Sequence, residues 1–244
     1  MEDIAARIAQ IHVRIAAAAR RAGRRPEAIT LVAVSKTHGP ALARAALAAG
    51  ATDLGENRVQ EAAPKIAALA AAAPRPRWHL IGHLQRNKAR AAAELFDMVQ
   101  SVDSLRLAET LDRYAAELDR RMPVLLQINV SGEASKEGFA LAGGVANRAA
   151  YARLIADLER VVALPQLEVR GLMTIAPLVG DAEAARPTFR LLRELRDDLA
   201  RRLPQARWDE LSMGMTDDFE AAITEGATIV RVGRAIFGDR LDHE

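Results

Sequence analysis

The sequence contains no cysteine among its 244 residues, which excludes disulfide bonds, thiolate metal ligands and cysteine nucleophiles. It also lacks any run of uninterrupted apolar residues long enough for a membrane span. Residues 1–23 carry charges throughout an apolar period of three to four, so they predict an amphipathic helix rather than a signal peptide. We therefore expect a cytoplasmic protein without a membrane partner.

Lysine is the scarce basic residue. Only four of the 34 basic residues are lysines, and the others are arginines. Lys36 follows the apolar run Leu31–Val34, which predicts a buried strand of a parallel sheet. Most lysines are surface residues, but a desolvated amine can lose its proton and attack a carbonyl, which a guanidinium cannot do. Lys36 is therefore a candidate for Schiff-base chemistry.

The composition indicates one large domain. Half of the residues are apolar, so the chain can bury a large core, and its length suits an α/β barrel. We see no linker, repeat or low-complexity tract, and we expect a single domain over residues 1–244. The formal charge is only +2, and arginines alternate with acidic residues, as in Arg190–Arg202. This pattern indicates solvated helix faces and no nucleic-acid partner.

Strand-like and helix-like segments alternate along the chain. Strands are predicted at Leu31–Lys36, Asp53–Asn57, Trp78–Gly82, Met98–Val102, Val124–Val130, Glu168–Ile175, Glu210–Met213 and Thr228–Val232. Helices are predicted at Pro40–Ala49, Arg58–Ala73, Arg86–Leu95, Ser104–Arg121, Val145–Val162, Ala182–Leu203, Asp217–Glu225 and Arg234–Phe237. This alternation predicts a (β/α)₈ barrel with an extra N-terminal helix. A doubly wound open sheet is the alternative, but no G-x-G-x-x-G follows the first strand.

The carboxyl ends of the last two predicted strands suggest a phosphate site, because phosphates bind there in barrels of this kind. Ser212 offers a hydroxyl, and Gly214 and Gly233 let the backbone approach a ligand closely. Gly233 also leads into a short helix whose free amides attract anions. Alone, these glycines would more readily indicate tight turns. Together with Lys36 in the same barrel, they favour phosphate.

Arg231 is predicted to point into the barrel. With a period of two, it lies on the face opposite Val230 and Val232, which would pack against the helices. A buried guanidinium needs a partner. Two interpretations are equally open: a structural ion pair with Glu56 or Asp53, or a contact with a ring nitrogen or carboxylate of a ligand.

The histidines do not form a metal motif, and we expect no metal. His79 and His83 lie in a strand context, where four residues span about 13 Å, so they cannot share one zinc. His83 lies just past a strand end and could contact a ligand, whereas His12, His38 and His243 have no suggestive neighbours.

Three other polar residues near the strand ends have a structural interpretation. Asp217 and Asp218 are expected in the first turn of a helix, where they interact with its dipole. Asn57 could equally cap the helix that follows it.

The lysine, the phosphate cradle and the inward arginine together resemble a pyridoxal 5′-phosphate site of the alanine-racemase barrel type (fold type III). The chain more closely resembles the pyridoxal phosphate homeostasis protein family. The motifs that carry this resemblance, in order from about Leu31 to Gly238, are VAVSKT, GENRVQEA, WHLIGHLQRNK, QINVSGEASKEGF, GLMTIAP, LSMGMTDDFEAAI and VRVGRAIFG.

The resemblance implies that Lys36 holds pyridoxal 5′-phosphate as a Schiff base. It further implies that Ser212 and the Gly233–Arg234 backbone hold the phosphate, that Arg231 faces the pyridine nitrogen, and that Asn57 lies near the ring. Arg234 stands where family members often have a threonine whose hydroxyl reaches the phosphate.

Carrier and enzyme make different demands on the same site. An arginine at the pyridine nitrogen disfavours its protonation and weakens the ring as an electron sink. In racemases resembling this barrel, a tyrosine base comes from an additional domain of a partner subunit, whereas Tyr114 and Tyr151 here fall within predicted helices. We therefore expect a carrier that stores, buffers or delivers the cofactor, with weak or no turnover. An amino-acid racemase and a cofactor-free class I aldolase-like barrel are the alternatives.

The resemblance leaves the partners and the remaining lysines less defined. Apo-enzymes that depend on pyridoxal phosphate are possible partners, and we expect a monomer. Lys88 and Lys136 lie in predicted loops that could border the mouth of the barrel, whereas Lys65, in the middle of a helix, is expected to be a solvated surface charge.

Overall fold

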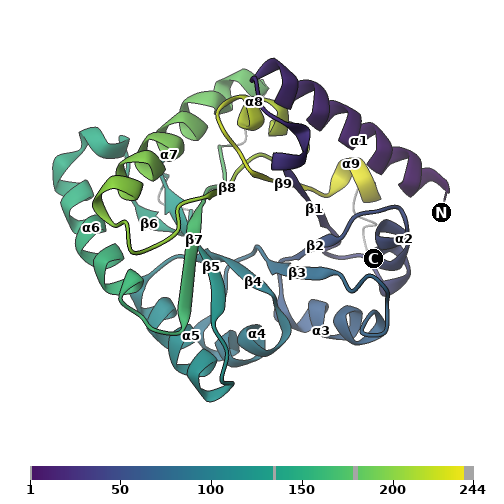
Figure 1. Cartoon of the computed structure of the whole chain (residues 1–244), viewed down its shortest axis with the longest axis horizontal. Coiled ribbons are helices and arrows are strands. Elements are labelled where there is room, and N and C mark those ends of the chain that lie inside the picture. Colours follow the sequence, from purple (N-terminus) through teal and green to yellow (C-terminus); the bar gives the residue numbers. More distant parts are fainter. Residues whose placement is uncertain (1, 134–135, 178–180, 239–244) are drawn as a thin grey trace.

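Eight parallel strands close into a barrel in the computed structural model, which describes residues 2–133, 136–177 and 181–238 (Figure 1). The strand order is β1-β2-β3-β4-β5-β7-β8-β9, and pairing of β9 with β1 closes the ring. The barrel strands are β1 Thr30–Val34, β2 Asp53–Glu56, β3 Arg77–Leu80, β4 Met98–Val102, β5 Met122–Asn129, β7 Leu167–Met173, β8 Glu210–Ser212 and β9 Ile229–Val232. All eight predicted strands are confirmed. The short β6 (Phe139–Ala140) pairs with β5 and was not predicted.

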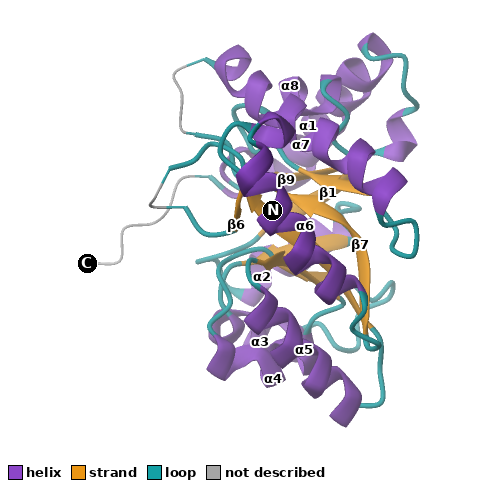
Figure 2. Ribbon diagram, turned by 90° about the vertical axis from the view of Figure 1, so that its left-hand side faces the viewer, coloured by secondary structure: helices purple, strands orange, loops and turns teal. Residues whose placement is uncertain are grey.

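Helices surround the barrel (Figures 1 and 2). They are α1 Glu2–Arg21, α2 Pro40–Ala48, α3 Val59–Ala68, α4 Ala89–Leu95, α5 Leu105–Glu117, α6 Arg148–Val162, α7 Ala182–Arg202, α8 Phe219–Thr224 and α9 Arg234–Phe237. The (β/α)₈ prediction is confirmed and the open sheet is wrong, because β4 pairs with β5 as well as with β3. The extra helix α1 flanks the barrel and packs against α2, α8 and α9. In the described ranges, no helix is both long enough and apolar enough to cross a membrane.

Several helices are shorter than predicted. The segment expected to be helical up to Ala73 forms α3 only as far as Ala68, and the helix expected from Val145 begins as a 3₁₀ turn, Gly144–Ala146. Helix α6 then starts at Arg148, because the Asn147 side chain accepts a hydrogen bond from the Ala150 amide. Alanine-rich sequence favours a helix but does not mark where it ends.

The barrel separates two apolar cores. The larger lies between the strands and the helices and includes Val230 and Val232, as the alternation in β9 predicts. The smaller lies inside the barrel and consists of Val32, Val34, Ile81, Met98, Leu125, Met173 and Ile229. The barrel is therefore a packed core rather than a pore.

Among the glycines that the structure describes, Gly171 in β7 has the closest neighbour. A Cβ atom there would lie 1.8 Å from the backbone oxygen of Glu210 in β8, and φ is +156°. The contact is with backbone of the adjacent strand, which cannot move without breaking the ladder.

We predict that Gly171→Ala destabilises the protein by about 3 kcal/mol or more, since overpacking against fixed atoms costs this much. Gly39→Ala is the matched control: φ is −75° and no neighbour lies within 4 Å of its Cβ position. It should cost about 1 kcal/mol or less. Urea unfolding of both variants measures the difference, and equal stabilities would contradict the prediction.

Candidate functional site

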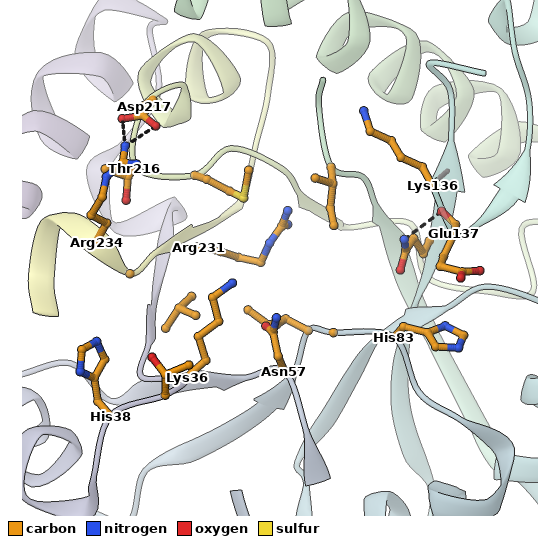
Figure 3. A pocket seen from close by; sticks show the side chains of 18 of the residues that line it. Lys36, His38, Asn57, His83, Lys136, Glu137, Thr216, Asp217, Arg231 and Arg234 are labelled. Carbon is orange, nitrogen blue, oxygen red and sulfur yellow. Dashed lines mark hydrogen bonds and ion pairs between the residues drawn. The ribbon is translucent and has the colours of Figure 1, made fainter. Parts of the chain in front are cut away.

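A cavity of about 850 Å³ opens at the carboxyl ends of the barrel strands. This volume is in the range of small-molecule sites. Figure 3 shows polar side chains that converge on it from separate elements of the barrel. The polar side chains labelled there are Lys36, His38, Asn57, His83, Lys136, Glu137, Thr216, Asp217, Arg231 and Arg234.

Positive charge dominates the cavity. Its lining carries four basic side chains of lysine or arginine against two carboxylates, Glu137 and Asp217. Asp217 forms an ion pair with Arg234 at the exposed rim. A cavity with such an excess of cations attracts an anionic ligand.

Lys36 lies in the turn just after β1, which ends at Val34 rather than at the lysine. It is half-buried and points into the cavity that Asn57 and Arg231 also line (Figure 3). The next residue, Thr37, has φ +67°. A β-branched residue in the left-handed region is strained by about 1–2 kcal/mol, and strain of this kind clusters at functional sites. The turn therefore directs the lysine into the cavity at some cost in stability.

A buried ion pair between Lys65 and Glu56 lies next to this turn and is hydrogen-bonded to its backbone. Lys65 in α3 donates to Glu56 Oε1 and to the Ser35 carbonyl, each at 2.7 Å, and the Ser35 hydroxyl donates to the same carboxylate oxygen at 2.6 Å. The prediction that Lys65 is a solvated surface charge is wrong: it is 4% exposed, because it shares the sheet-facing side of α3 with Val59 and Ala62. Its ammonium thus fixes the backbone next to Lys36.

Burial and nearby charges shift the pKa values of two groups around this turn, Glu56 and His38. Burial raises the pKa of Glu56, and the hydrogen bonds from Lys65 and Ser35 offset only part of that rise. Near the cavity, burial and the charge of Lys65 lower the pKa of His38, whose ring stacks on Phe237 with centroids 5.3 Å apart. His38 is therefore neutral at pH 7.

Arg231 points into the barrel as predicted, and it is 4% exposed. Its Nη1 donates to the Ser212 hydroxyl at 2.6 Å and its Nη2 to the Thr174 carbonyl at 2.9 Å. The suggested ion pair with Glu56 or Asp53 is wrong, because Glu56 pairs with Lys65 and Asp53 with His79 and Arg77. In the part of the chain that the structure covers, Arg231 makes no ion pair.

A buried guanidinium with only neutral partners is costly, so its place at the cavity floor indicates a ligand that accepts a hydrogen bond. Burial lowers the pKa of Arg231 to about 10, while Asp218 opposes this shift, so the side chain stays protonated at neutral pH.

The residues expected to hold phosphate lie at two depths in the barrel. Gly233 and Arg234 line the cavity, whereas Ser212 is fully buried beneath it and donates to Gln100. The glycines have a packing role: a Cβ on Gly214 would lie 2.6 Å from Ala222 Cβ, and one on Gly233 would lie 3.2 Å from the Val34 carbonyl oxygen. Both therefore permit close approach of elements, as the turn interpretation expects.

Three further expectations concern residues beside these strands. Asn57 lines the cavity, and the N-cap position of α3 is the next residue, Arg58, whose side chain makes no capping hydrogen bond, so Asn57 is not the cap. Asp218 is the N-cap residue of α8 and its carboxylate accepts from the Met215 amide, while Asp217 turns away to Arg234. The dipole interpretation therefore does not describe Asp217.

Sequence reasoning missed several cavity residues. Thr216, Glu137 and His38 line the cavity, and His38 was judged to have no suggestive neighbours. The rule that sites form at strand carboxyl ends could have found Thr216, which follows β8 in sequence. The same rule covers Glu137, which lies next to Lys136 in the loop that follows β5.

The two loop lysines differ. Lys136 lines the cavity and pairs with Glu133 at 2.8 Å, as expected for a residue at the mouth. Lys88 ends the 3₁₀ turn Arg86–Lys88 and is not among the cavity residues. The rim also brings together His83, Asp103 and Glu137, whose ligand atoms lie within 4.8 Å of one another. Within this cluster, His83 Nδ1 and Asp103 form a hydrogen bond of 2.9 Å.

Comparison with known proteins agrees with this geometry. The family model of the alanine racemase N-terminal domain matches residues 7–241. A pyridoxal phosphate homeostasis protein of Pseudomonas aeruginosa is 46% identical over 240 residues, which cover 98% of this chain and 97% of that protein. This chain belongs to the pyridoxal phosphate homeostasis protein family.

Solved structures extend the comparison of this family member. PipY of Synechococcus elongatus, solved with PLP bound, is 42% identical with a TM-score of 0.82, covering 96% of this chain and 100% of PipY. An alanine racemase of Clostridium difficile has a TM-score of 0.70 at 13% identity, which shows a shared fold alone. The match covers 98% of this chain but 56% of that racemase.

We predict that Lys65→Met destabilises the protein by about 3–5 kcal/mol, because it leaves the buried Glu56 carboxylate without its cation. The double variant Lys65→Met/Glu56→Leu should recover part of this loss, since no buried charge remains unpaired. Lys88→Met is the control and should change stability by no more than about 0.5 kcal/mol. Urea unfolding measures all three. A double variant less stable than Lys65→Met would contradict the ion-pair account.

Proposed function

We propose that this protein binds pyridoxal 5′-phosphate at the carboxyl end of its barrel and serves intracellular homeostasis of that cofactor by storing, buffering or delivering it. The observation that carries the proposal is the buried Arg231, whose hydrogen-bond partners among the described residues are neutral and which opens onto a cationic cavity shared with Lys36. The family and the solved PipY with PLP bound support the same ligand.

The residues present fit this cofactor. The Lys36 amine would hold the aldehyde carbon as a Schiff base, and an Arg231 N–H group would donate to the ring nitrogen. Asn57 would lie beside the ring. Thr216 and the Gly233–Arg234 backbone, which line the cationic rim, would receive the phosphate. Ser212, also expected at the phosphate, lies beneath the cavity and accepts a hydrogen bond from Arg231 instead.

The same residues favour a carrier over an efficient enzyme. Bound pyridoxal phosphate supplies an aldehyde for attachment and a ring that withdraws electrons once its nitrogen is protonated. Arg231 stays protonated at neutral pH and occupies the donor position, so it keeps a proton off that nitrogen.

Neither tyrosine of the chain lies near the cavity. Tyr114 lies on α5, and the Tyr151 hydroxyl on α6 donates to Asp198 on α7, outside the barrel. Racemisation needs an acid or base on each face of the substrate carbon. The tyrosine that supplies one face in racemases has no counterpart in this cavity, which supports the carrier over the racemase.

Delivery requires partners that take up the cofactor. We propose that these are apo-enzymes dependent on pyridoxal phosphate, and that the carrier acts in the cytoplasm as a monomer. Over the described ranges, the exposed large hydrophobic side chains are Val13 and Ile175. Two separate residues do not make an apolar patch of the kind that permanent subunit interfaces bury.

We predict that the wild-type protein incubated with pyridoxal phosphate absorbs near roughly 420 nm, as expected for a lysine Schiff base of this cofactor, and that borohydride fixes the adduct on Lys36. Lys36→Ala should lose both signals while keeping its thermal unfolding temperature, since Lys36 lies in a turn outside the strands. Absorption spectra and peptide mass mapping measure this.

Lys88→Ala is the matched control, because Lys88 is a loop lysine outside the cavity, and it should keep the wild-type spectrum. A wild type that takes up no cofactor, or an adduct that persists in Lys36→Ala, would overturn the site. Rapid formation of D-alanine from L-alanine by the loaded protein would favour the racemase. A colourless protein that borohydride labels only with an added aldehyde substrate would favour the aldolase-like alternative.

A further inference from the structure

A chain of hydrogen bonds crosses the barrel interior below the cavity. It runs from Arg231 in β9 to Ser212 in β8 (2.6 Å), to Gln100 in β4 (2.6 Å), to His79 in β3 (3.0 Å) and to Asp53 in β2 (2.8 Å). All five residues are less than 5% exposed. The bond between Ser212 and Gln100 spans the lumen, because β8 and β4 are separated by β5 and β7 around the ring.

The direction of every bond in this chain follows from its first member. A guanidinium can only donate, so the Ser212 oxygen accepts from Arg231 and its single proton goes to Gln100 Oε1. The amide nitrogen of Gln100 therefore faces His79 Nδ1 and donates to it. His79 must then carry its proton on Nε2, which donates to Asp53.

The far end of the chain anchors it at the opposite side of the barrel. The carboxylate of Asp53 also pairs with Arg77 at 2.7 Å. Burial would raise the pKa of Asp53, but the contacts with His79 and Arg77 outweigh it and lower the pKa. An ionised carboxylate thus terminates a chain that begins at a cation.

We propose that Gln100 and His79 are positioning residues for the cofactor: through Ser212, they hold the Arg231 guanidinium in the orientation that presents its remaining N–H groups to the ring nitrogen. This inference rests on the proposed function. The contacts with Ser212 and Thr174 use two of the five N–H groups of Arg231. A flexible side chain held at two points inside a packed barrel loses its rotational freedom before the ligand arrives, which strengthens binding.

The test compares pyridoxal phosphate binding by the full chain and its variants, using equilibrium dialysis and the visible absorption band. Gln100→Leu keeps the side-chain size but removes both hydrogen bonds, so Ser212 loses its acceptor and Arg231 its fixed partner. We expect affinity to fall roughly tenfold, the effect of losing about one hydrogen bond, and the band to shift. Ser212→Ala is the second variant, with the same expectation, in case Gln100→Leu does not fold.

Two further variants separate positioning from general stability. In an Arg231→Met background, Gln100→Leu should cause no further loss, because the residue through which it acts is gone. Gln100→Glu keeps an oxygen that accepts from the Ser212 hydroxyl, so it should retain more of the wild-type affinity than Gln100→Leu. Thr188→Val, a buried polar substitution on α7 outside the barrel, is the control and should leave both affinity and band unchanged.

The outcomes distinguish this inference from the function on which it rests. A wild type that does not bind the cofactor overturns the proposed function itself. Wild-type binding with an unchanged Gln100→Leu and Ser212→Ala overturns only the positioning role. An equal loss from Gln100→Leu in the wild-type and Arg231→Met backgrounds also overturns it, because the effect would then not pass through Arg231.

Discussion

Closure of the strands into a ring is the constraint on which the rest of the molecule depends. Once β4 pairs with β5, each inward side chain faces other strands instead of water. Inward apolar residues pack into the small interior core, and inward polar residues must satisfy one another, since an unpaired buried polar group is costly. The chain from Arg231 to Asp53 is the result: one donor-only cation orders the hydroxyl, amide and imidazole groups that follow it.

The cavity is built on two buried polar assemblies with different roles. On the β1 side, the Lys65–Glu56 pair and the Ser35 hydroxyl fix the backbone that carries Lys36. On the β9 side, Ser212 and the Thr174 carbonyl fix Arg231. Amine and guanidinium thus reach the same cavity from two rigid supports (Figure 3). Because folding already fixes these side chains, the entropy of ordering them is not lost when a ligand binds.

Sequence patterns predicted the helices and strands better than they predicted the contacts of individual side chains. All eight strands were found, because buried parallel strands have distinct apolar runs between breakers. The inward direction of Arg231 followed from a period of two. Its partners did not, because Ser212 and Thr174 come from other strands whose relative register no local pattern contains. Lys65 was misassigned for a similar reason: a lysine on a helix looks solvated until the face of that helix is known.

The sequence by itself determined the barrel, the family, and the placing of a lysine and an inward arginine at the strand ends, because these follow from periodicity, residue type and motif order along the chain. Only the tertiary structure decided that Ser212 lies beneath Arg231, that Gln100 and His79 continue from it, and that Thr216 and His38 reach the cavity. These contacts join residues as far as 112 positions apart. Closure of the barrel brings these residues together, and their spacing along the chain does not indicate which of them will be in contact.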